Sequence, residues 1–314
     1  MTTSIAIERA TLDRCPACRA PDARMRCQRT FRGRRWTLAQ CRRCDLQFTS
    51  PVPSPDDLQS FYAGRYHAQL RSAGETDAAF GAKYLRYAAT LRRHLPTGRV
   101  VDIGCSTGLL VRTLRDSGYE AEGIELNHES AAWGRAHYGA EIHTEALEHC
   151  FAPESLDAVL LTDVLEHTQH PRDFLRDVAT RLVPGGFALI TFPDIQSIES
   201  RYQQLLAQVF RRDWMWSSCH IPLHVWEFTR ATAEACFAAA GFRVLELRRS
   251  QLPSEPAATL ALAALACPLR LLQWAPLARC CGSQMEFVIC KVAADGVRTN
   301  SEFSIESDRA VAHA

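Results

Sequence analysis

Four of the thirteen cysteines form two pairs near the start of the chain. Cys15 and Cys18 belong to a Cys-Pro-Ala-Cys motif, and Cys41 and Cys44 belong to a Cys-Arg-Arg-Cys motif that follows after 22 residues. Two such tight turns can present four thiolates tetrahedrally, which predicts a structural zinc ribbon with no open coordination position. A redox pair is the alternative, but neither motif stands between a strand and a helix. Cys27 lies between the pairs and is interpreted as a bystander.

A glycine-containing loop, VDIGCSTG at residues 101–108, is the second pattern that could do chemistry. Gly104 and Gly108 would let the backbone turn sharply and approach a ligand, and the helix that follows would offer its N-terminal N–H groups. The GxxxG spacing disfavours NAD and favours another nucleoside-type cofactor. Close packing of helix on strand is the alternative role of such glycines. Glu125, near the end of the next apolar run, could accept both hydroxyls of a ribose.

Asp163, Glu166 and His167 form the third pattern, directly after the apolar run DAVLL. On a helical turn after a strand, all three would project toward the same ligand, and His167 can titrate near neutrality as a general base. His220 and His224 in CHIPLH are further catalytic candidates. The same oxygen and imidazole groups could hold a second, divalent metal at Asp163, Glu166 and His167, with a buried structural histidine as the alternative.

Together these motifs resemble the class I S-adenosylmethionine-dependent methyltransferases. VDIGCSTG, the acidic end of IEL, SLDAVLLTDVLEHTQHP and LVPGGFALITFP occur in the order that this family shows, and the likeness covers roughly residues 77–293. It implies an α/β fold: a Rossmann-like seven-stranded sheet with helices on both faces and a reversed last hairpin. The cysteine motifs and the segment SPVPSPDDLQSFYAGRY look like the zinc-binding leader of many bacterial methyltransferases. Ser106 departs from the family, which commonly has another glycine there, but a small serine should still permit the turn.

The resemblance also implies that S-adenosylmethionine is the cofactor. The residues that would bind it all lie at or after strand ends: Asp102 on the methionine amino group, Gly104, Cys105 and Gly108 in the loop along the methionine portion, Glu125 on the ribose, Leu126 against the adenine, Glu145 or Ala146 beside the adenine edge, and Thr162 with Asp163 facing the sulfonium. Leu126 in the core and Glu145 as a solvated charge are the alternatives.

The segment from Asp163 to His167 is similar to the metal-binding ExxEH motif of some ubiquinone-pathway and small-RNA methyltransferases. In those proteins a further histidine comes from downstream, and here His220 or His224 could provide it. Asp163 stands where the first glutamate would be, which is a departure from that motif.

The elements that must position these residues divide the chain into four parts. We expect a zinc ribbon (1–50), a linker (51–76), a methyltransferase domain (77–293) and a disordered tail (294–314). A helix is predicted at 77–95, and short apolar runs then alternate with helical segments around a mostly parallel sheet. Residues 196–228, which include three tryptophans, are expected to form an acceptor lid.

Residues 254–280 form an apolar insertion that contains Pro268 and Arg270. These breaks argue against a transmembrane helix and predict packing on the lid, a dimer face or peripheral membrane contact. The odd number of cysteines and the absence of a signal-like N-terminus predict a reducing, cytoplasmic location. No pattern indicates an oligomeric state.

The net charge of +1 conceals a division, because the first fifty residues carry +7 and the remainder carries −6. A composition of 47% hydrophobic and 23% charged residues excludes a disordered or collagen-like chain. We therefore predict methyl transfer to a small-molecule acceptor, such as a sugar, a lipid-linked compound or a secondary metabolite. Two alternatives stay open: an RNA methyltransferase whose arginine-rich ribbon binds nucleic acid, and a non-catalytic zinc-ribbon interaction protein.

Overall fold

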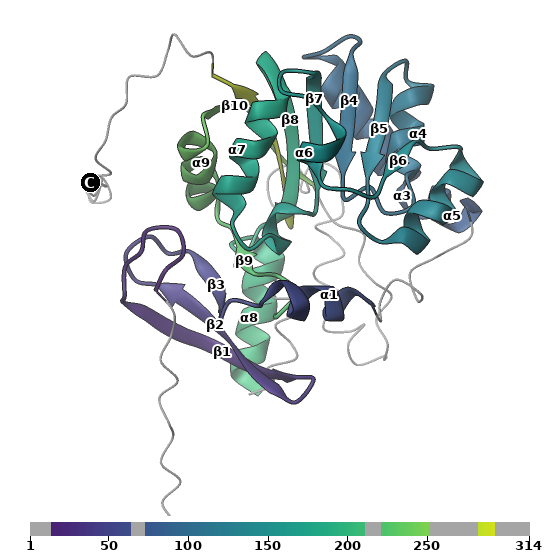
Figure 1. The fold of residues 1–314 in the computed structure, drawn as a ribbon. Helices are drawn as coiled ribbons and strands as arrows, with labels where there is room; N and C mark the ends of the chain where they lie inside the picture. The colour runs from purple at the N-terminus through teal and green to yellow at the C-terminus, as the bar shows by residue number, and fades with distance from the viewer. Residues whose placement is uncertain (1–13, 64–72, 211–220, 251–281, 293–314) are drawn as a thin grey trace, which may run out of the picture.

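The computed structural model describes residues 14–63, 73–210, 221–250 and 282–292, which form two sheets with flanking helices (Figure 1). The larger sheet has seven strands in the order β10-β11-β8-β7-β4-β5-β6. Its strands are β4 (Arg99–Ile103), β5 (Glu120–Ile124), β6 (Ile142–His143), β7 (Leu156–Thr162), β8 (Leu182–Pro193), β10 (Phe242–Ser250) and β11 (Gln284–Lys291). β4 to β8 pair in parallel, whereas β11 runs antiparallel to both β8 and β10. The predicted seven-stranded α/β sheet is confirmed.

The structure has eight α-helices and one 3-10 helix within the described residues, and some of them begin at capping residues. They are α1 (Pro55–Ala63), α3 (Ala73–Arg92), α4 (Leu109–Asp116), α5 (His128–Tyr138), α6 (Leu147–Cys150), the 3-10 helix η1 (Leu165–His167), α7 (Pro171–Arg181), α8 (Ile198–Phe210) and α9 (Arg230–Ala239). The side chain of Asn127 caps α5 by accepting from the backbone of Ser130, and Pro171 opens α7 with its ring in the first turn.

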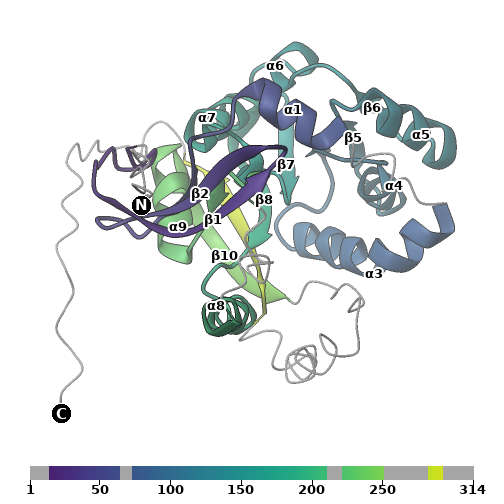
Figure 2. The ribbon, with the colours of Figure 1, turned by 90° about the horizontal axis from the view of Figure 1, so that it is seen from below.

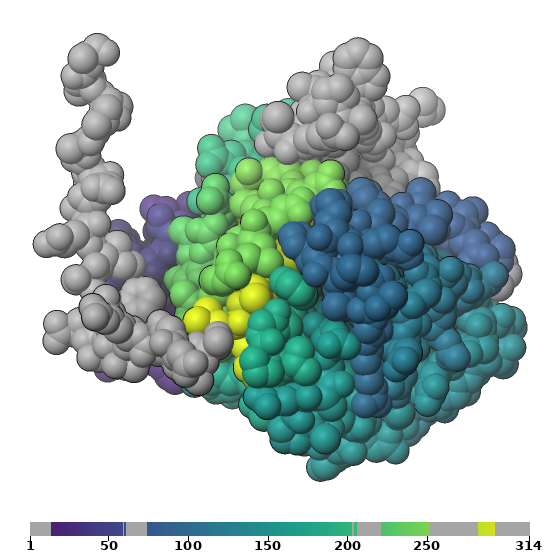
Figure 3. Space-filling model, turned by 90° about the horizontal axis from the view of Figure 1, so that it is seen from above, coloured from purple at the N-terminus to yellow at the C-terminus, as the bar shows by residue number. Residues whose placement is uncertain are grey.

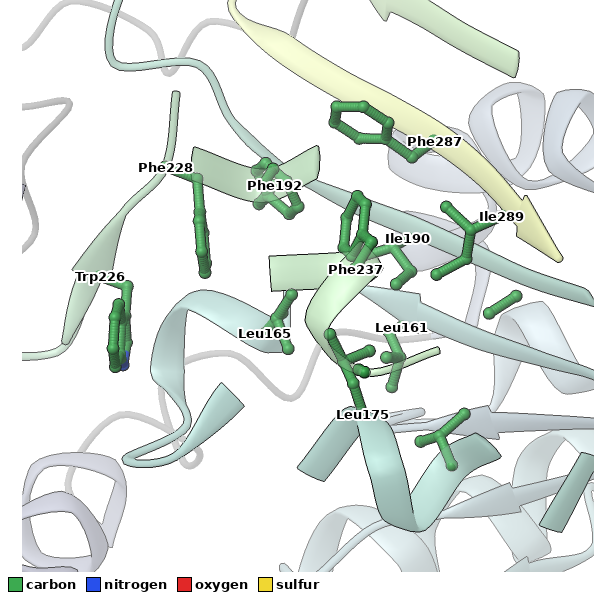
Figure 4. Packing of buried hydrophobic residues seen from close by; sticks show 14 of the residues in the cluster. Leu161, Leu165, Leu175, Ile190, Phe192, Trp226, Phe228, Phe237, Phe287 and Ile289 are labelled. Atoms are coloured by element: carbon green, nitrogen blue, oxygen red, sulfur yellow. The ribbon is translucent and has the colours of Figure 1, made fainter. Parts of the chain in front are cut away.

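Two hydrophobic cores lie on opposite faces of the larger sheet, because successive strand residues point to opposite sides. On one face, Leu161 of β7 packs with Leu175 of α7 and Phe237 of α9, and Figure 4 shows these side chains together. On the other face, Leu160 of the same strand packs with Leu114 of α4 and with α3. All of the residues named here are fully buried. The helices therefore cover both faces of the larger sheet.

The smaller sheet is antiparallel and contains the predicted ribbon. It joins β1 (Ala23–Phe31), β2 (Arg34–Cys41), β3 (Gln47–Ser50) and β9 (Trp226–Glu227) in that order. β9 comes from the segment predicted as an acceptor lid, so part of that segment completes the ribbon sheet. The backbone N–H of Thr49 donates to Val225 O at 2.9 Å, and the Thr49 hydroxyl donates to His224 O at 2.6 Å.

The segment around β9 also binds the turn that follows β7. Val225 N donates to Glu166 O at 2.8 Å, and the indole N–H of Trp226 donates to Thr168 O at 2.8 Å. Cys15 and Phe48 of the ribbon share one buried core with Trp226 and the larger sheet. The ribbon is thus packed at the carboxyl edge of the larger sheet, as Figures 1 and 2 show, and in the view of Figure 3 it is visible only at the margin.

The structure differs from the expected boundaries in two places. α1 occupies part of the predicted linker, where the hydroxyl of Ser54 accepts from Asp57 N and starts the helix. The helix predicted at 77–95 spans 73–92 as α3. No helix within the described ranges is long and apolar enough to cross a membrane. The apolar insertion at 254–280 and the tail at 294–314 lie outside the described residues.

Candidate cofactor and acceptor site

The loop after β4 is bound to the end of the neighbouring strand. The backbone N–H groups of Gly104 and Cys105 both donate to Ile124 O, at 2.8 and 3.1 Å. Gly104 has φ 74° and Ser106 has φ 51°, both in the left-handed region. That region is open to glycine but costs other residues about 1–2 kcal/mol. Ser106, where the methyltransferase family commonly has glycine, therefore has a backbone conformation that favours glycine.

Glu125, directly after β5, is 5% exposed, and its carboxylate is held by the backbone. One oxygen accepts from Ser106 N at 2.9 Å, and the other accepts from Asn127 N at 2.8 Å. These two bonds fix the orientation of the carboxylate, which as an ionised group has about four acceptor positions. The arrangement suits a ligand that brings two hydroxyl donors, as predicted for the ribose.

Asp102, in β4, is 1% exposed, and its Oδ1 has no hydrogen-bond partner among the described residues. Burial, and then the charge of Glu125, raises the pKa of Asp102 well above its usual value. A buried oxygen without a partner is costly. A cationic amino group placed beside it would satisfy the oxygen and favour its ionised form, which is the contact predicted for the methionine portion.

The side-chain space at Gly108, in the loop, and at Gly123, in β5, is occupied by neighbouring atoms. A Cβ on Gly108 would lie 2.8 Å from the Cβ of Ala140, and a Cβ on Gly123 would lie 2.5 Å from the Sγ of Cys105. Cys105 is 7% exposed. The structure therefore favours the close-packing role for Gly108, and it buries Cys105 with its thiol against β5.

The remaining predicted cofactor residues lie at strand ends along the same edge. Leu126 follows β5 with 68% of its surface exposed. Glu145, exposed, and Ala146, half-buried, follow β6, and half-buried Thr162 is the last residue of β7. Each of these residues therefore lies at or after the end of a strand, where it was predicted.

Glu166, His167 and His224 form a compact group whose candidate ligand atoms lie within 4.8 Å of one another. Glu166 is 1% exposed, and neither of its carboxylate oxygens has a hydrogen-bond partner among the described residues. Burial, followed by the charge of Asp163, raises the pKa of Glu166 well above its usual value. Nδ1 of His167 donates to Leu223 O at 2.9 Å, which assigns the proton of the neutral ring to Nδ1.

Glu227 extends this group on the side of β9. Its Oε1 lies 3.2 Å from Nδ1 of His224, and the rings of His167 and His224 meet edge to face at 4.8 Å. Glu227 is 2% exposed, and burial raises its pKa. Sequence reasoning did not single out Glu227, although it lies three residues after His224.

Asp163 lies beside this group but is bound by other residues. Its Oδ2 accepts from Nζ of Lys83 at 3.1 Å, and its Oδ1 accepts from Nε2 of Gln284 at 2.5 Å and from the hydroxyl of Thr191 at 3.3 Å. The predicted metal ligands were Asp163, Glu166 and His167. In the structure the group that could hold a metal ion consists of Glu166, His167 and His224 instead. The ion pair of Lys83 with Asp163 was not predicted. One feature of the sequence that could have drawn attention to Lys83 is that the chain contains only two lysines.

The four paired cysteines converge at the end of the ribbon. Sγ of Cys15 lies 3.6 Å from that of Cys44, and Sγ of Cys18 lies 3.5 Å from that of Cys41. All four lie within the range of a shared ion. Contact with Cys44 lowers the pKa of the Cys15 thiol to about 5. Cys27 is buried in β1 outside this group, as predicted for a bystander.

His220, together with the lid residues Trp214 and Trp216, lies outside the described residues. Its predicted catalytic role stays a prediction. Among the described residues, His224 is a downstream histidine that lies beside Glu166 and His167.

A family model described as a methyltransferase domain matches residues 73–247. The chain belongs to this methyltransferase family. The matched region begins with α3 and ends within β10, so it covers the ends of β4, β5, β6 and β7 and leaves β1, β2, β3 and β11 outside.

Curated relatives of this methyltransferase cover part of its length. It is 33% identical over 105 residues to the ubiquinone biosynthesis O-methyltransferase of Burkholderia thailandensis, which is 31% of this chain and 45% of that protein. The enzyme of the same name from Xanthomonas campestris pv. campestris is 34% identical over 99 residues, 29% of this chain and 41% of that protein. The chain thus spans less than half the length of these relatives.

Two solved structures share the fold of this methyltransferase at low identity. A chain of the complex between the Haloferax volcanii Trm112 methyltransferase activator and a putative methyltransferase has a TM-score of 0.54 at 18% identity and covers 76% of this chain and 100% of its own. Burkholderia thailandensis 1,6-didemethyltoxoflavin-N1-methyltransferase, solved with 1,6-didemethyltoxoflavin and S-adenosylhomocysteine, has a TM-score of 0.51 at 16% identity and covers 84% and 99%. The predicted class, an S-adenosylmethionine-dependent methyltransferase, is confirmed at the level of the family.

Proposed function

We propose that this methyltransferase transfers a methyl group from S-adenosylmethionine to a small-molecule acceptor. The carrying observation is the pair of carboxylates at the ends of adjacent strands: Asp102 with an orphaned buried oxygen, and Glu125 with its carboxylate oriented by backbone donors. Such a pair suits a ligand with an amino group at one end and a ribose diol further along the sheet edge. Relatives named as O-methyltransferases support an acceptor of small-molecule size.

The other strand-end residues complete the proposed donor site. Leu126 supplies exposed apolar surface for the adenine. Glu145 or Ala146 lies beside the adenine edge, and Thr162 faces the sulfonium. Gly104 and the backbone of Cys105 hold the loop against β5, which sets the distance between the loop and the ribose-binding carboxylate.

Methyl transfer depends more on the alignment of the acceptor with the methyl group than on reactive side chains. When bound, S-adenosylmethionine supplies a methyl group on a positively charged sulfur. The chain must hold the acceptor in line with that methyl group and, where the acceptor carries a proton, remove it. His167 suits that task because its Nδ1 is held by Leu223 O, so Nε2 is the basic nitrogen of the neutral ring. The acceptor proton would pass to that nitrogen.

A divalent cation fits Glu166, His167 and His224. The fit rests on the buried Glu166 carboxylate, whose two oxygens have no partner within the described part of the chain, and on two imidazoles at ligand distance. One carboxylate with two imidazoles is a donor set for first-row transition metals. With a cation bound, Nε2 of His167 would be a ligand and would no longer serve as the base. The cation would supply positive charge to an acceptor oxygen, and Glu227 would orient His224 through its Nδ1.

A structural zinc ion fits Cys15, Cys18, Cys41 and Cys44, whose sulfur atoms already face one another. Four thiolates leave no position for a substrate, so this ion would stabilise the ribbon and take no part in methyl transfer. None of the nine cysteines in the described residues forms a disulfide, so each of the four is present as a thiol. We also propose a cytoplasmic location for the protein.

A nucleic-acid acceptor is a second candidate, favoured by the exposed arginines of the ribbon hairpin. They are Arg24, Arg29, Arg32, Arg34 and Arg35. Arg34 forms an ion pair with Asp57 at 3.0 Å, so part of the positive charge is neutralised within the chain. RNA binding that weakens steeply with salt would support this candidate. RNA binding that is undetectable or independent of salt would contradict the nucleic-acid acceptor and favour the small-molecule acceptor.

Calorimetry with S-adenosylhomocysteine tests the donor site directly. We expect wild-type protein to bind, and Glu125→Ala to weaken binding about tenfold or more, because charge-assisted hydrogen bonds to the ribose are lost. Glu120→Ala is the matched control, since Glu120 is exposed at the opposite end of the same strand. No binding by wild-type protein would contradict the proposed function, and unchanged binding by Glu125→Ala would contradict the ribose assignment alone.

A further inference from the structure

α3 lies along the cofactor loop and the end of β7, where it places polar side chains that sequence reasoning did not assign. It packs against α4, the helix that follows the loop, and Figure 2 shows the two helices side by side. Burial, and then the charges of Asp102 and Asp163, raises the pKa of Tyr84. The ring of Tyr84 also contacts those of Phe80 and Tyr87. One face of α3 therefore borders the proposed donor site.

Lys83 connects this face of α3 to the end of β7. Its ammonium lies 3.1 Å from Oδ2 of Asp163, and its side chain is only 12% exposed. The same ammonium lies over the ring of Tyr87, at 5.6 Å from the centroid. A lysine that is largely withdrawn from water needs a charged partner, and Asp163 is that partner here.

Asp163 is in turn fixed from the opposite side by the strands β8 and β11. Thr191 and Gln284 both donate to its Oδ1. With Lys83 on Oδ2, three donors from three separate elements converge on one carboxylate. Both oxygens of Asp163 already accept from side chains of the protein, whereas a general base must receive the proton of the acceptor on one of its oxygens. Asp163, at the end of β7, thus connects α3, β8 and β11 through its side chain.

We propose that Lys83 is a positioning residue for methyl transfer, which holds α3 against the donor site through Asp163, and that Asp163 serves as the anchor of this helix rather than as the base. The inference rests on the proposed function, because it assigns Lys83 to the same donor site. It differs from a purely structural role in one respect: the loss of Lys83 must weaken donor binding, not only folding.

Replacement of the two lysines separates these roles. Lys83→Met should raise the dissociation constant of S-adenosylhomocysteine and the KM for S-adenosylmethionine about tenfold, the effect of one lost charge-assisted contact, with a smaller change in kcat. Lys83→Arg should restore most of the binding. Lys291→Met is the matched control, because Lys291 donates to Leu182 O at 2.7 Å and pairs with Glu154, away from the donor site. Binding by Lys291→Met should equal that of wild type.

Asp163→Asn provides the second arm. An anchor predicts weakened donor binding, no further loss when Lys83→Met is added, and faster amide exchange in α3. A base predicts a loss of kcat of about 10² or more with donor binding retained, which would overturn the proposal. Unchanged donor binding in folded Lys83→Met would also overturn it, and if that variant does not fold, Asp163→Asn decides. Wild-type protein that fails to bind S-adenosylhomocysteine would instead refute the proposed function.

Discussion

Ser106 lies at φ 51° between two glycines, in a loop whose backbone contacts do not require its side chain. Replacement by glycine should relieve backbone strain, and we expect Ser106→Gly to raise the free energy of unfolding by about 1 kcal/mol. Denaturant unfolding measures this difference. Ser117→Gly is the control, because Ser117 ends α4 at φ −86° and gains nothing from glycine. Equal effects of the two changes would contradict the assignment of strain to Ser106.

Asp102 should make folding stability depend on pH. Because burial raises its pKa in the folded state, its contribution is present below the ordinary value of 3.8 and is lost as the pH rises toward the folded value. Asp102→Asn has no carboxyl group to ionise. The melting temperature of this variant, relative to that of wild type, should therefore increase as the pH rises from about 4 to about 8. Parallel melting curves across that range would contradict the buried, unpaired carboxylate. S-adenosylhomocysteine should stabilise wild type more than the variant, since the amino-group contact is lost.

At the scale of elements, the sequence predicted what repeats along the chain and missed what joins distant parts. The apolar runs predicted β4, β5, β7, β8, β10 and β11, because each of these strands is one short, continuous segment of the sequence. β9 has two residues and no pattern of its own, and it exists as a strand only because Phe48 pairs with Trp226. Lys83 and Asp163 are 80 residues apart, so no local spacing links them. The strand-end residues were found because each follows its strand directly.

Gly108 tests the contact between the loop and the elements packed on it. Gly108→Ala would place a Cβ 2.8 Å from Ala140 at φ 77°. Gly118→Ala is the matched control, because its φ is 91° and nothing lies within 4 Å of the added Cβ. Both changes carry the backbone cost, and overpacking should add about 1–3 kcal/mol at Gly108 alone. Chemical denaturation of both variants measures the difference, and equal losses would show that the loop does not need the close approach.

At the scale of the whole molecule, the ribbon and the acceptor site share a segment. β9 lies between β3 and the turn that carries Glu166, with hydrogen bonds on both sides. We therefore expect Cys15→Ser to lower the bound zinc, to increase amide exchange at Val225, and to reduce methyl transfer. Elemental analysis and hydrogen exchange measure the first two effects. Cys27→Ser is the control, since Cys27 lies outside the metal group. Loss of zinc without any change at Val225 would show that the two parts are independent.

The pairing of β3 with β9 has a consequence for synthesis on the ribosome. Thr49 and its partner His224 are separated by 175 residues. At a translation rate of about 5–20 residues per second, the first three ribbon strands would wait roughly 10–35 s before their fourth strand is made. During that interval the edge of β3 is unpaired and exposed to other chains. Zinc captured early by the four cysteines would hold the nascent ribbon in register until its partner strand arrives.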